Sequence, residues 1–253
     1  MISLKSKDWE IDNIETILLD KDGTFIDLHF FWGKITEMRV IKIIENYKLT
    51  NDYLEKLCKI LGYDINIKKM IPDGITAMYS RSKIIEIFRG KLLEMNIEIL
   101  ESELVEIFDS VSEDFYKSIE NYVKPIEDAI EFIKKMYSLD IKLGIVTSDS
   151  VKATNLILKS FGWDKYFKVV IGRESSAYTK ESGIPTKLAL DKLNANPKTT
   201  LMIGDAPMDY VSAKNADIEN IILVSTGQIS LKELTQTTSY VVQSLKDLEC
   251  LKI

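Results

Sequence analysis

The sequence is poor in the residues on which several catalytic classes depend. It has two cysteines and one histidine among 253 residues. Two cysteines are too few for a disulfide framework or a thiolate zinc site, so the chain is expected to be cytoplasmic. A single histidine excludes multi-histidine zinc sites, and it leaves a nucleophile–histidine triad only if His29 is itself the base. Carboxylates are therefore expected to carry the chemistry.

Basic charge and long apolar runs are also scarce. Lysine and arginine number 33 against 39 acidic residues, which gives a net charge of -6. A nucleic-acid partner is disfavoured, because binding a phosphate backbone needs a basic face. No apolar run approaches the roughly 20 residues that cross a bilayer, and the charged start of the chain is unlike a signal peptide, so no membrane partner is expected. Monomer and homodimer both remain open.

The C-terminal half has the pattern of an α/β fold with a parallel sheet. Short apolar runs alternate there with amphipathic segments. We predict a helix beginning at Pro125, helices over 151–160, 186–193, 208–215 and 231–234, and strands over 141–146, 167–171, 200–203, 221–224 and 239–242. The segment 16–20 matches these strands, because it is short, apolar and followed by charge and glycine.

The segment between these parts differs, because its apolar residues recur at helical spacing without comparable strand blocks. Helices are expected over 34–47, 52–61 and 101–119. Since single cores stop growing at roughly 250 residues, two units are expected. We predict a Rossmann-like α/β core of residues 1–28 and 122–253, with a mainly helical insert of residues 29–121.

Acidic residues follow two of the predicted strands. Asp20 and Asp22 come directly after the first strand, and Asp205 and Asp209 follow the strand at 200–203. Parallel strands present their carboxyl ends at one edge of a sheet, so Asp20, Asp22 and Asp205 can converge there. A plain Asp-Gly turn is the alternative for the first pair. A calcium loop of EF-hand type is excluded, because its glycine and glutamate positions hold Phe25 and Phe31.

Clustered carboxylates repel one another unless a cation offsets their charge. Oxygen ligands with few protein groups suit Mg²⁺, so a hard divalent metal is predicted. A third strand end supplies Thr147 and Ser148, whose hydroxyl and backbone N–H groups are candidates for binding an anionic oxygen. Helix capping is the alternative role, favoured for Ser148 and Asp149 individually.

These residues together resemble the four motifs of the haloacid dehalogenase superfamily of phosphohydrolases. The resemblance rests on Asp20-Lys-Asp-Gly-Thr24, Thr147, a lysine near position 180 and Gly204-Asp205 through Asp209. Within the superfamily, the phosphoglycolate-phosphatase-like branch is the most similar, and the helical insert resembles its cap. The lysine motif departs from the usual Lys-Pro-x-Pro, so Lys180 is preferred as the motif lysine and Lys187 is the alternative.

The resemblance implies a Mg²⁺-dependent phosphatase that acts on a small phosphorylated metabolite, a phosphomonoester. Asp20 would be the nucleophile that forms an aspartyl-phosphate, and Asp22 the general acid and base. The Asp20 side chain, the Asp22 backbone carbonyl and Asp205 would hold the metal, with Asp209 orienting them. Thr147, Ser148 and Lys180 would bind the substrate phosphate, and Thr24 would shape the loop.

Three other functions are compatible with parts of this pattern. A phosphosugar mutase of the same superfamily is disfavoured by Thr24, where mutases more often carry valine. A dehalogenase does not need Asp22. A receiver-like phosphoacceptor module would lack the helical insert and would hold phosphate without rapid turnover.

Overall fold

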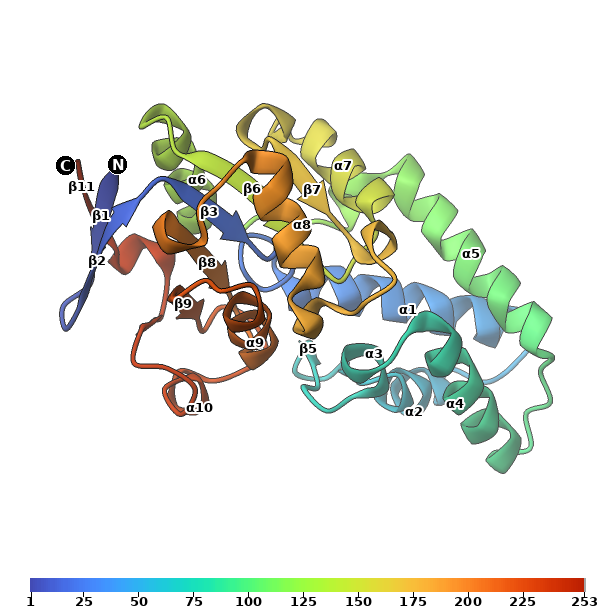
Figure 1. Ribbon diagram of the computed structural model, residues 1–253. Coiled ribbons are helices and arrows are strands. Elements are labelled where there is room, and N and C mark those ends of the chain that lie inside the picture. Colours follow the sequence, from blue (N-terminus) through green and yellow to red (C-terminus); the bar gives the residue numbers. More distant parts are fainter. Residues whose placement is uncertain (253) are drawn as a thin grey trace. The chain divides into compact units, whose positions relative to one another are not determined.

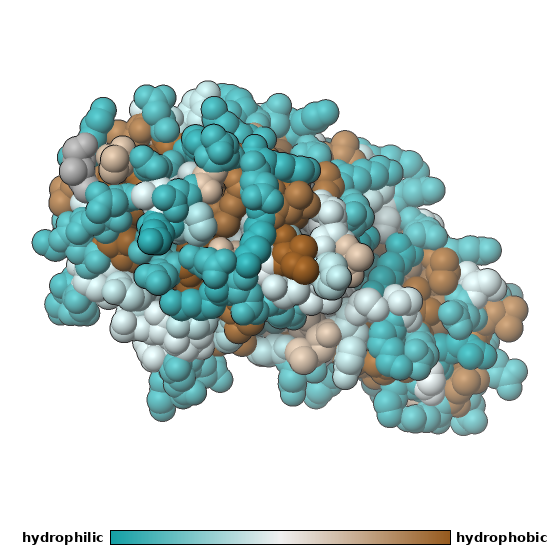
Figure 2. Space-filling view, in the orientation of Figure 1, coloured by the Kyte–Doolittle hydropathy of each residue, from teal (hydrophilic) through white to brown (hydrophobic). Residues whose placement is uncertain are grey.

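The computed structural model describes residues 1–252. These divide into two units, one made of Met1–Asp27 together with the chain from Pro125 onward, and the other of Leu28–Lys124. The boundaries between the two units fall at 27/28 and 124/125, whereas the sequence predicted them at 28/29 and 121/122. In the described residues no helix has the length and apolarity needed to cross a bilayer. On the face seen in Figure 2, hydrophilic side chains predominate and apolar ones lie in small separate groups.

Six parallel strands form the central sheet of the first unit, in the order β10-β9-β8-β3-β6-β7 (Figure 1). Their bounds are β3 Thr16–Leu19, β6 Lys142–Val146, β7 Val169–Ile171, β8 Thr200–Gly204, β9 Asn220–Val224 and β10 Val241–Val242. Every residue of β3 and β8 is buried, as continuous apolar strands at the centre of a parallel sheet require. The predicted α/β class with a parallel sheet is confirmed.

Helices flank this sheet. They are α6 Glu127–Ser138, α7 Val151–Ser160, α8 Ile184–Leu193, α9 Pro207–Asn215 and the short α10 Leu231–Leu234. Leu18 of β3 and Met202 of β8 pack with Ala189 of α8 and Ala213 of α9 in one apolar core. The alternate residues Ile17, Leu19 and Leu201 are also fully buried, because both faces of the sheet are covered.

One expectation about the first unit was wrong, and one of its sheets was not foreseen. Pro125 does not begin a helix, because its backbone forms an antiparallel bridge with Ile26 and α6 starts only at Glu127. A second sheet was also missed: β1 Ile2–Lys5 pairs with β2 Glu10–Ile14 and with β11 Glu249–Lys252, all antiparallel. These strands are short and partly charged, and their pairing joins the two ends of the chain, which a local pattern does not reveal.

The second unit is mainly helical. Its elements are α1 Leu28–Asn46, α2 Tyr53–Ile60, β4 Tyr63–Asp64, β5 Lys69–Met70, α3 Ile75–Met78, α4 Arg81–Glu94 and α5 Glu101–Lys117. Val40, Phe88 and Phe108, from α1, α4 and α5, lie in one apolar core that belongs to this unit. The sequence missed the β4–β5 hairpin, because two residues in each strand are too few to produce a period-two pattern.

Candidate active site

Several chain segments bring polar side chains to the carboxyl edge of the central sheet. Strand β3 lies between β6 and β8, with Leu19 opposite Ile145 on one side and Ile203 on the other. The Asp20 backbone N–H donates to the Ile203 carbonyl at 2.9 Å, which extends the pairing to the end of the strand. The residues that follow β3, β6 and β8 therefore emerge side by side.

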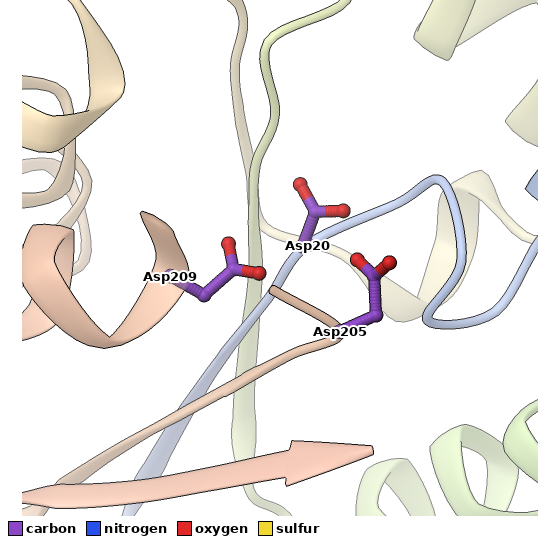
Figure 3. A group of neighbouring side chains, drawn as sticks. All are labelled: Asp20, Asp205 and Asp209. Atoms are coloured by element: carbon purple, nitrogen blue, oxygen red, sulfur yellow. The ribbon is translucent and has the colours of Figure 1, made fainter. Parts of the chain in front are cut away.

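Three carboxylates converge at this edge. Asp20, Asp205 and Asp209 are all buried, and one carboxylate oxygen of each lies within 4.8 Å of those of the other two (Figure 3). Asp20 follows β3, Asp205 follows β8, and Asp209 lies in the first turn of α9. The structure thus brings together the strand-end carboxylates that the sequence separates widely.

Two glycines allow Asp205 to sit this close to the first loop. Gly23 has φ of +84°, a conformation that costs glycine little, and a Cβ there would lie 2.3 Å from Asp205 Oδ2. A Cβ at Gly227, in the loop after β9, would lie 1.7 Å from the same oxygen. Thr226 in that loop also donates to the Gly23 carbonyl. The loop after β9 therefore forms one wall around Asp205.

Lys180 supplies positive charge to the carboxylates. Its ammonium group lies 2.5 Å from Asp20 Oδ1 and 2.6 Å from Asp209 Oδ1, and the residue is 6% exposed. Burial opposes the charged form, but the attraction of Asp20 and Asp209 outweighs it and raises the pKa of Lys180. The alternative lysine, Lys187, is 50% exposed and pairs with Asp217. The geometry thus favours Lys180 as the lysine of the site.

For the phosphate release that the sequence resemblance implies, we expect Lys180→Met to lower kcat/KM by about 10²- to 10³-fold, the cost of losing one preorganised charge at a phosphoryl group. Lys187→Met should stay within about twofold of the wild type, because an exposed ion pair contributes little. Steady-state kinetics of both variants would check this. A larger loss in Lys187→Met than in Lys180→Met would reverse the assignment.

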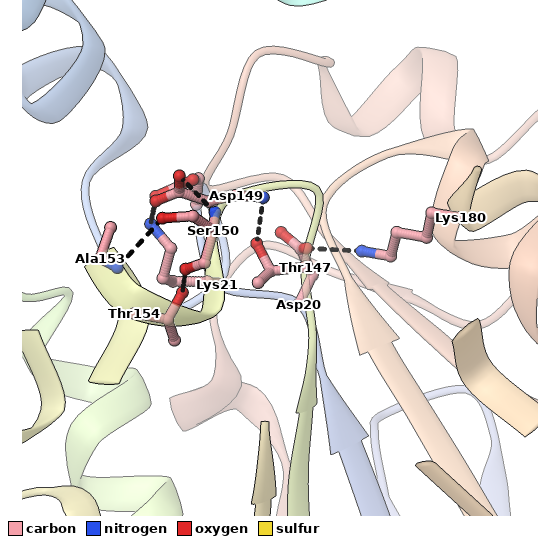
Figure 4. A network of polar contacts seen from close by, with 9 residues as sticks. Asp20, Lys21, Thr147, Asp149, Ser150, Ala153, Thr154 and Lys180 are labelled. Atoms are coloured by element: carbon pink, nitrogen blue, oxygen red, sulfur yellow. Dashed lines mark hydrogen bonds and ion pairs between the residues drawn. The ribbon is translucent and has the colours of Figure 1, made fainter. Parts of the chain in front are cut away.

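Asp22 belongs to a second charged cluster beside the first. The Lys21 ammonium lies 3.2 Å from Asp149 Oδ2 (Figure 4). It also donates to Asp22 Oδ1, and Lys21 is completely buried. Burial raises the pKa of Asp22 to about 6, although Lys21 lowers it in part. The carboxylate of Asp22 is thus outside the group formed by Asp20, Asp205 and Asp209, although it stands only two positions from Asp20.

The loop after β6 differs in detail from expectation. Thr147 is buried, but its hydroxyl accepts a hydrogen bond from the Asp149 N–H at 3.1 Å, so that N–H is not available to a substrate oxygen. Ser150, rather than Ser148 or Asp149, caps α7 by accepting from the Ala153 N–H at 3.0 Å. Ser148 is exposed, and its hydroxyl lies 3.8 Å from Met208 Sδ.

The carboxylates fit a hard divalent cation. The group contains three buried carboxylates, and the Lys180 ammonium pairs with two of them, so negative charge remains in excess when all three are ionised. Burial, together with Asp20 and Asp209, raises the pKa of Asp205 well above its ordinary value. Both carboxylate oxygens of Asp209 already have partners, because Oδ1 pairs with Lys180 and Oδ2 accepts from the Ala206 N–H at 3.1 Å. Asp20 and Asp205 are therefore the better metal ligands, and all the donors are oxygens, which Mg²⁺ prefers.

Mg²⁺ is expected to stabilise the protein in a pH-dependent manner. Protons compete with a cation for carboxylates. Burial raises the pKa of Asp205 well above its ordinary value, and it raises the pKa of Asp209 to about 6. The increase in Tm on adding MgCl₂ should be large at about pH 8 and nearly absent at about pH 5. Differential scanning fluorimetry would measure it, with NaCl of equal ionic strength as control. An equal shift at both pH values would contradict this expectation.

The sequence missed part of the site. Lys21 stands between two motif aspartates, and nothing in a single sequence shows that it is buried with Asp149. The role of Gly227 was also missed, although the Thr-Gly pair one residue beyond an apolar strand was a usable signal.

Comparisons with known proteins identify the family of this chain. The model of the haloacid dehalogenase-like hydrolase family matches residues 14–217. A protein named putative pyrophosphatase PpaX, from Caldanaerobacter subterraneus subsp. tengcongensis, is 27% identical over 209 residues, which are 82% of this chain and 80% of that protein.

Two solved structures share the fold. A predicted phosphoglycolate phosphatase from Haemophilus somnus aligns with a TM-score of 0.70 at 16% identity, over 94% of this chain and 97% of the other. A putative β-phosphoglucomutase from Thermotoga maritima aligns with a TM-score of 0.68 at 18% identity, over 92% and 96%. With motif residues after β3, β6 and β8 and a family match over most of its length, the chain belongs to the haloacid dehalogenase-like hydrolases and is a hydrolase of the phosphatase type.

Proposed function

We propose that the protein is a Mg²⁺-dependent phosphatase that hydrolyses a small phosphomonoester through an aspartyl-phosphate on Asp20. The observation that carries this proposal is the convergence of Asp20, Asp205 and Asp209 at the carboxyl edge of the sheet, where Lys180 pairs with Asp20 and Asp209. Membership of the family supports the same chemistry. Residues 1–28 and 122–253 would be the catalytic core, and residues 29–121 the cap that selects the substrate.

In the first step an Asp20 carboxylate oxygen attacks phosphorus, and the bond from phosphorus to the leaving oxygen breaks. Asp22 donates its proton to that oxygen. Its pKa of about 6 suits this role, because a group with a pKa near the working pH can both give and take a proton. The products are the alcohol and phosphorylated Asp20.

In the second step a water molecule attacks phosphorus, and Asp22 takes its proton. The bond from phosphorus to the Asp20 oxygen breaks, which releases inorganic phosphate and restores the carboxylate. Asp20 suits this role because an ionised carboxylate needs no activating base.

Lys180 and Thr147 would bind the oxygens of the transferred group, with Ser148 beside them. Lys180 is held rigidly by two carboxylates, so its charge needs no reorganisation during the reaction. Mg²⁺, held by the Asp20 side chain, the Asp22 carbonyl and Asp205, would supply charge that offsets the phosphate oxygens.

Hydrolysis of pyrophosphate is the second candidate, favoured by the relatives named pyrophosphatase PpaX. Both reactions use the same nucleophile and differ in the leaving group, which is a phosphate in one case and an alkoxide in the other. Isomerisation of a sugar phosphate is a weaker candidate, supported by the fold of one solved structure.

A panel of substrates would test the proposal. Release of inorganic phosphate would be measured with MgCl₂ for a set of small phosphomonoesters and for pyrophosphate. The proposal predicts multiple turnovers, with the highest kcat/KM on a monoester. A preference for pyrophosphate would select the second candidate. One phosphate bound per chain without turnover would support a receiver-like module, and isomerisation primed by a sugar bisphosphate would support a mutase.

A further inference from the structure

We propose that Lys21 and Asp149 are positioning residues that hold the Asp22 carboxylate in place for proton transfer. The inference rests on the proposed function, because it concerns the group that acts there as acid and base. Asp22 follows β3 and Asp149 follows β6, so the Lys21 ammonium joins two neighbouring strand ends through one buried charge.

A lysine is an unusual choice for a completely buried position. Taking an ammonium group out of water costs free energy unless opposite charges surround it. The preceding residues Ile17, Leu18 and Leu19 are all buried and apolar, and an apolar side chain at position 21 would fill space without that cost. We therefore attribute the lysine at this position to the two carboxylates that its ammonium group contacts, those of Asp22 and Asp149.

Asp149 is a fixed anchor for this contact. Its Oδ1 accepts from the Ser150 N–H at 2.7 Å, its N–H donates to the Thr147 hydroxyl at 3.1 Å, and its carbonyl accepts from the Arg173 N–H at 3.0 Å. These bonds tie the residue to the helix that follows β6 and to the segment after β7. Oδ2 then faces the Lys21 ammonium (Figure 4).

The backbone of Lys21 is held as firmly as its side chain. The Lys21 carbonyl accepts from the N–H groups of Phe25 and Ile26, each at 3.1 Å. Because the backbone and the ammonium group of Lys21 are both fixed, the hydrogen bond from this ammonium to Asp22 Oδ1 limits how the Asp22 carboxylate can turn. A carboxylate fixed in this way can meet the leaving oxygen in one orientation, which is what efficient proton transfer requires.

The test compares substrates that differ in their need for a proton. An alkyl phosphate has a poor leaving group and needs Asp22 as an acid, whereas p-nitrophenyl phosphate has a good one and needs it little. We expect Lys21→Met to lower kcat/KM by about 10- to 100-fold for the alkyl phosphate and by less than about threefold for the aryl phosphate. Because kcat/KM covers the steps up to departure of the leaving group, the ratio of kcat/KM for the aryl phosphate to kcat/KM for the alkyl phosphate isolates the acid role.

Two further variants make the test specific. Asp149→Asn keeps the shape of the anchor but removes its charge, and it should shift the substrate ratio in the same direction; it carries the test if Lys21→Met does not fold. In Asp22→Asn/Lys21→Met the ratio should equal that of Asp22→Asn alone, because a positioning residue has no effect once its target is gone. Lys246→Met, at an exposed lysine, is the matched control.

Equal losses on both substrates, or no loss on either, would overturn the inference, since a purely structural role predicts no change in the ratio. A ratio in the double variant that exceeds that of Asp22→Asn would also overturn it. Failure of the proposed function is recognised separately, because Asp20→Asn would then retain activity on both substrates.

Discussion

Asp20→Asn is expected to lower kcat for phosphate release by about 10⁴-fold or more, which is the scale on which removal of a catalytic nucleophile acts. The asparagine amide has the same shape but lacks the negative charge and the nucleophilic oxygen that attack phosphorus. Lys180 would keep its contact with Asp209, so the fold should persist.

The rate of phosphate release under saturating substrate and MgCl₂ measures this effect. Asp191→Asn, which changes an exposed aspartate of α8 in the same way, is the matched control and should match the wild type. Circular dichroism would verify the fold of both variants. Activity of Asp20→Asn within tenfold of the wild type would remove Asp20 as the nucleophile.

Asp205→Asn is expected to abolish the stabilisation by Mg²⁺ and to raise the stability of the metal-free protein. Burial, together with Asp20 and Asp209, raises the pKa of Asp205, so the folded state binds this proton more tightly than the unfolded state. Ionisation of Asp205 therefore destabilises the fold above the ordinary pKa of an aspartate, and this cost disappears as the pH falls toward that value. A neutral amide avoids the cost at every pH.

Thermal unfolding at about pH 8, with and without MgCl₂, tests both parts of this expectation. The variant should unfold at a higher temperature than the wild type without metal and should show no shift on adding MgCl₂. A Mg²⁺-dependent shift as large as that of the wild type would mean that Asp205 is not a metal ligand.

The sequence predicted the parts of the site that depend on strand ends. Asp20 and Asp205 each follow a short apolar strand, and the geometry of parallel sheets then requires their loops to share one edge. This prediction needed no knowledge of the contacts between residues that lie far apart in the chain. The choice of Lys180 rested on the resemblance to the family, and the ion pairs with Asp20 and Asp209 agree with it.

Other features depend on contacts that a linear pattern does not encode. The pairing of β1 with β11 joins the two ends of the chain, and the bridge from Lys21 to Asp149 joins two loops. The helix cap after β6 was placed one or two residues too early, at Asp149 or Ser148, because serine and aspartate are both good caps and only backbone geometry selects Ser150. The backbone bridge between Pro125 and Ile26 likewise delayed the start of α6.

Transfer of the phosphoryl group to Asp20 is the central claim, and trapping the intermediate tests it most directly. The protein would be mixed with a phosphomonoester and MgCl₂, quenched in acid within one turnover, digested and examined by mass spectrometry. We predict a phosphoryl group on Asp20 that hydroxylamine removes, as expected for an acyl phosphate, and none in Asp20→Asn. A phosphoryl group on another residue, or full turnover with no phosphorylated protein at any quench time, would contradict the mechanism.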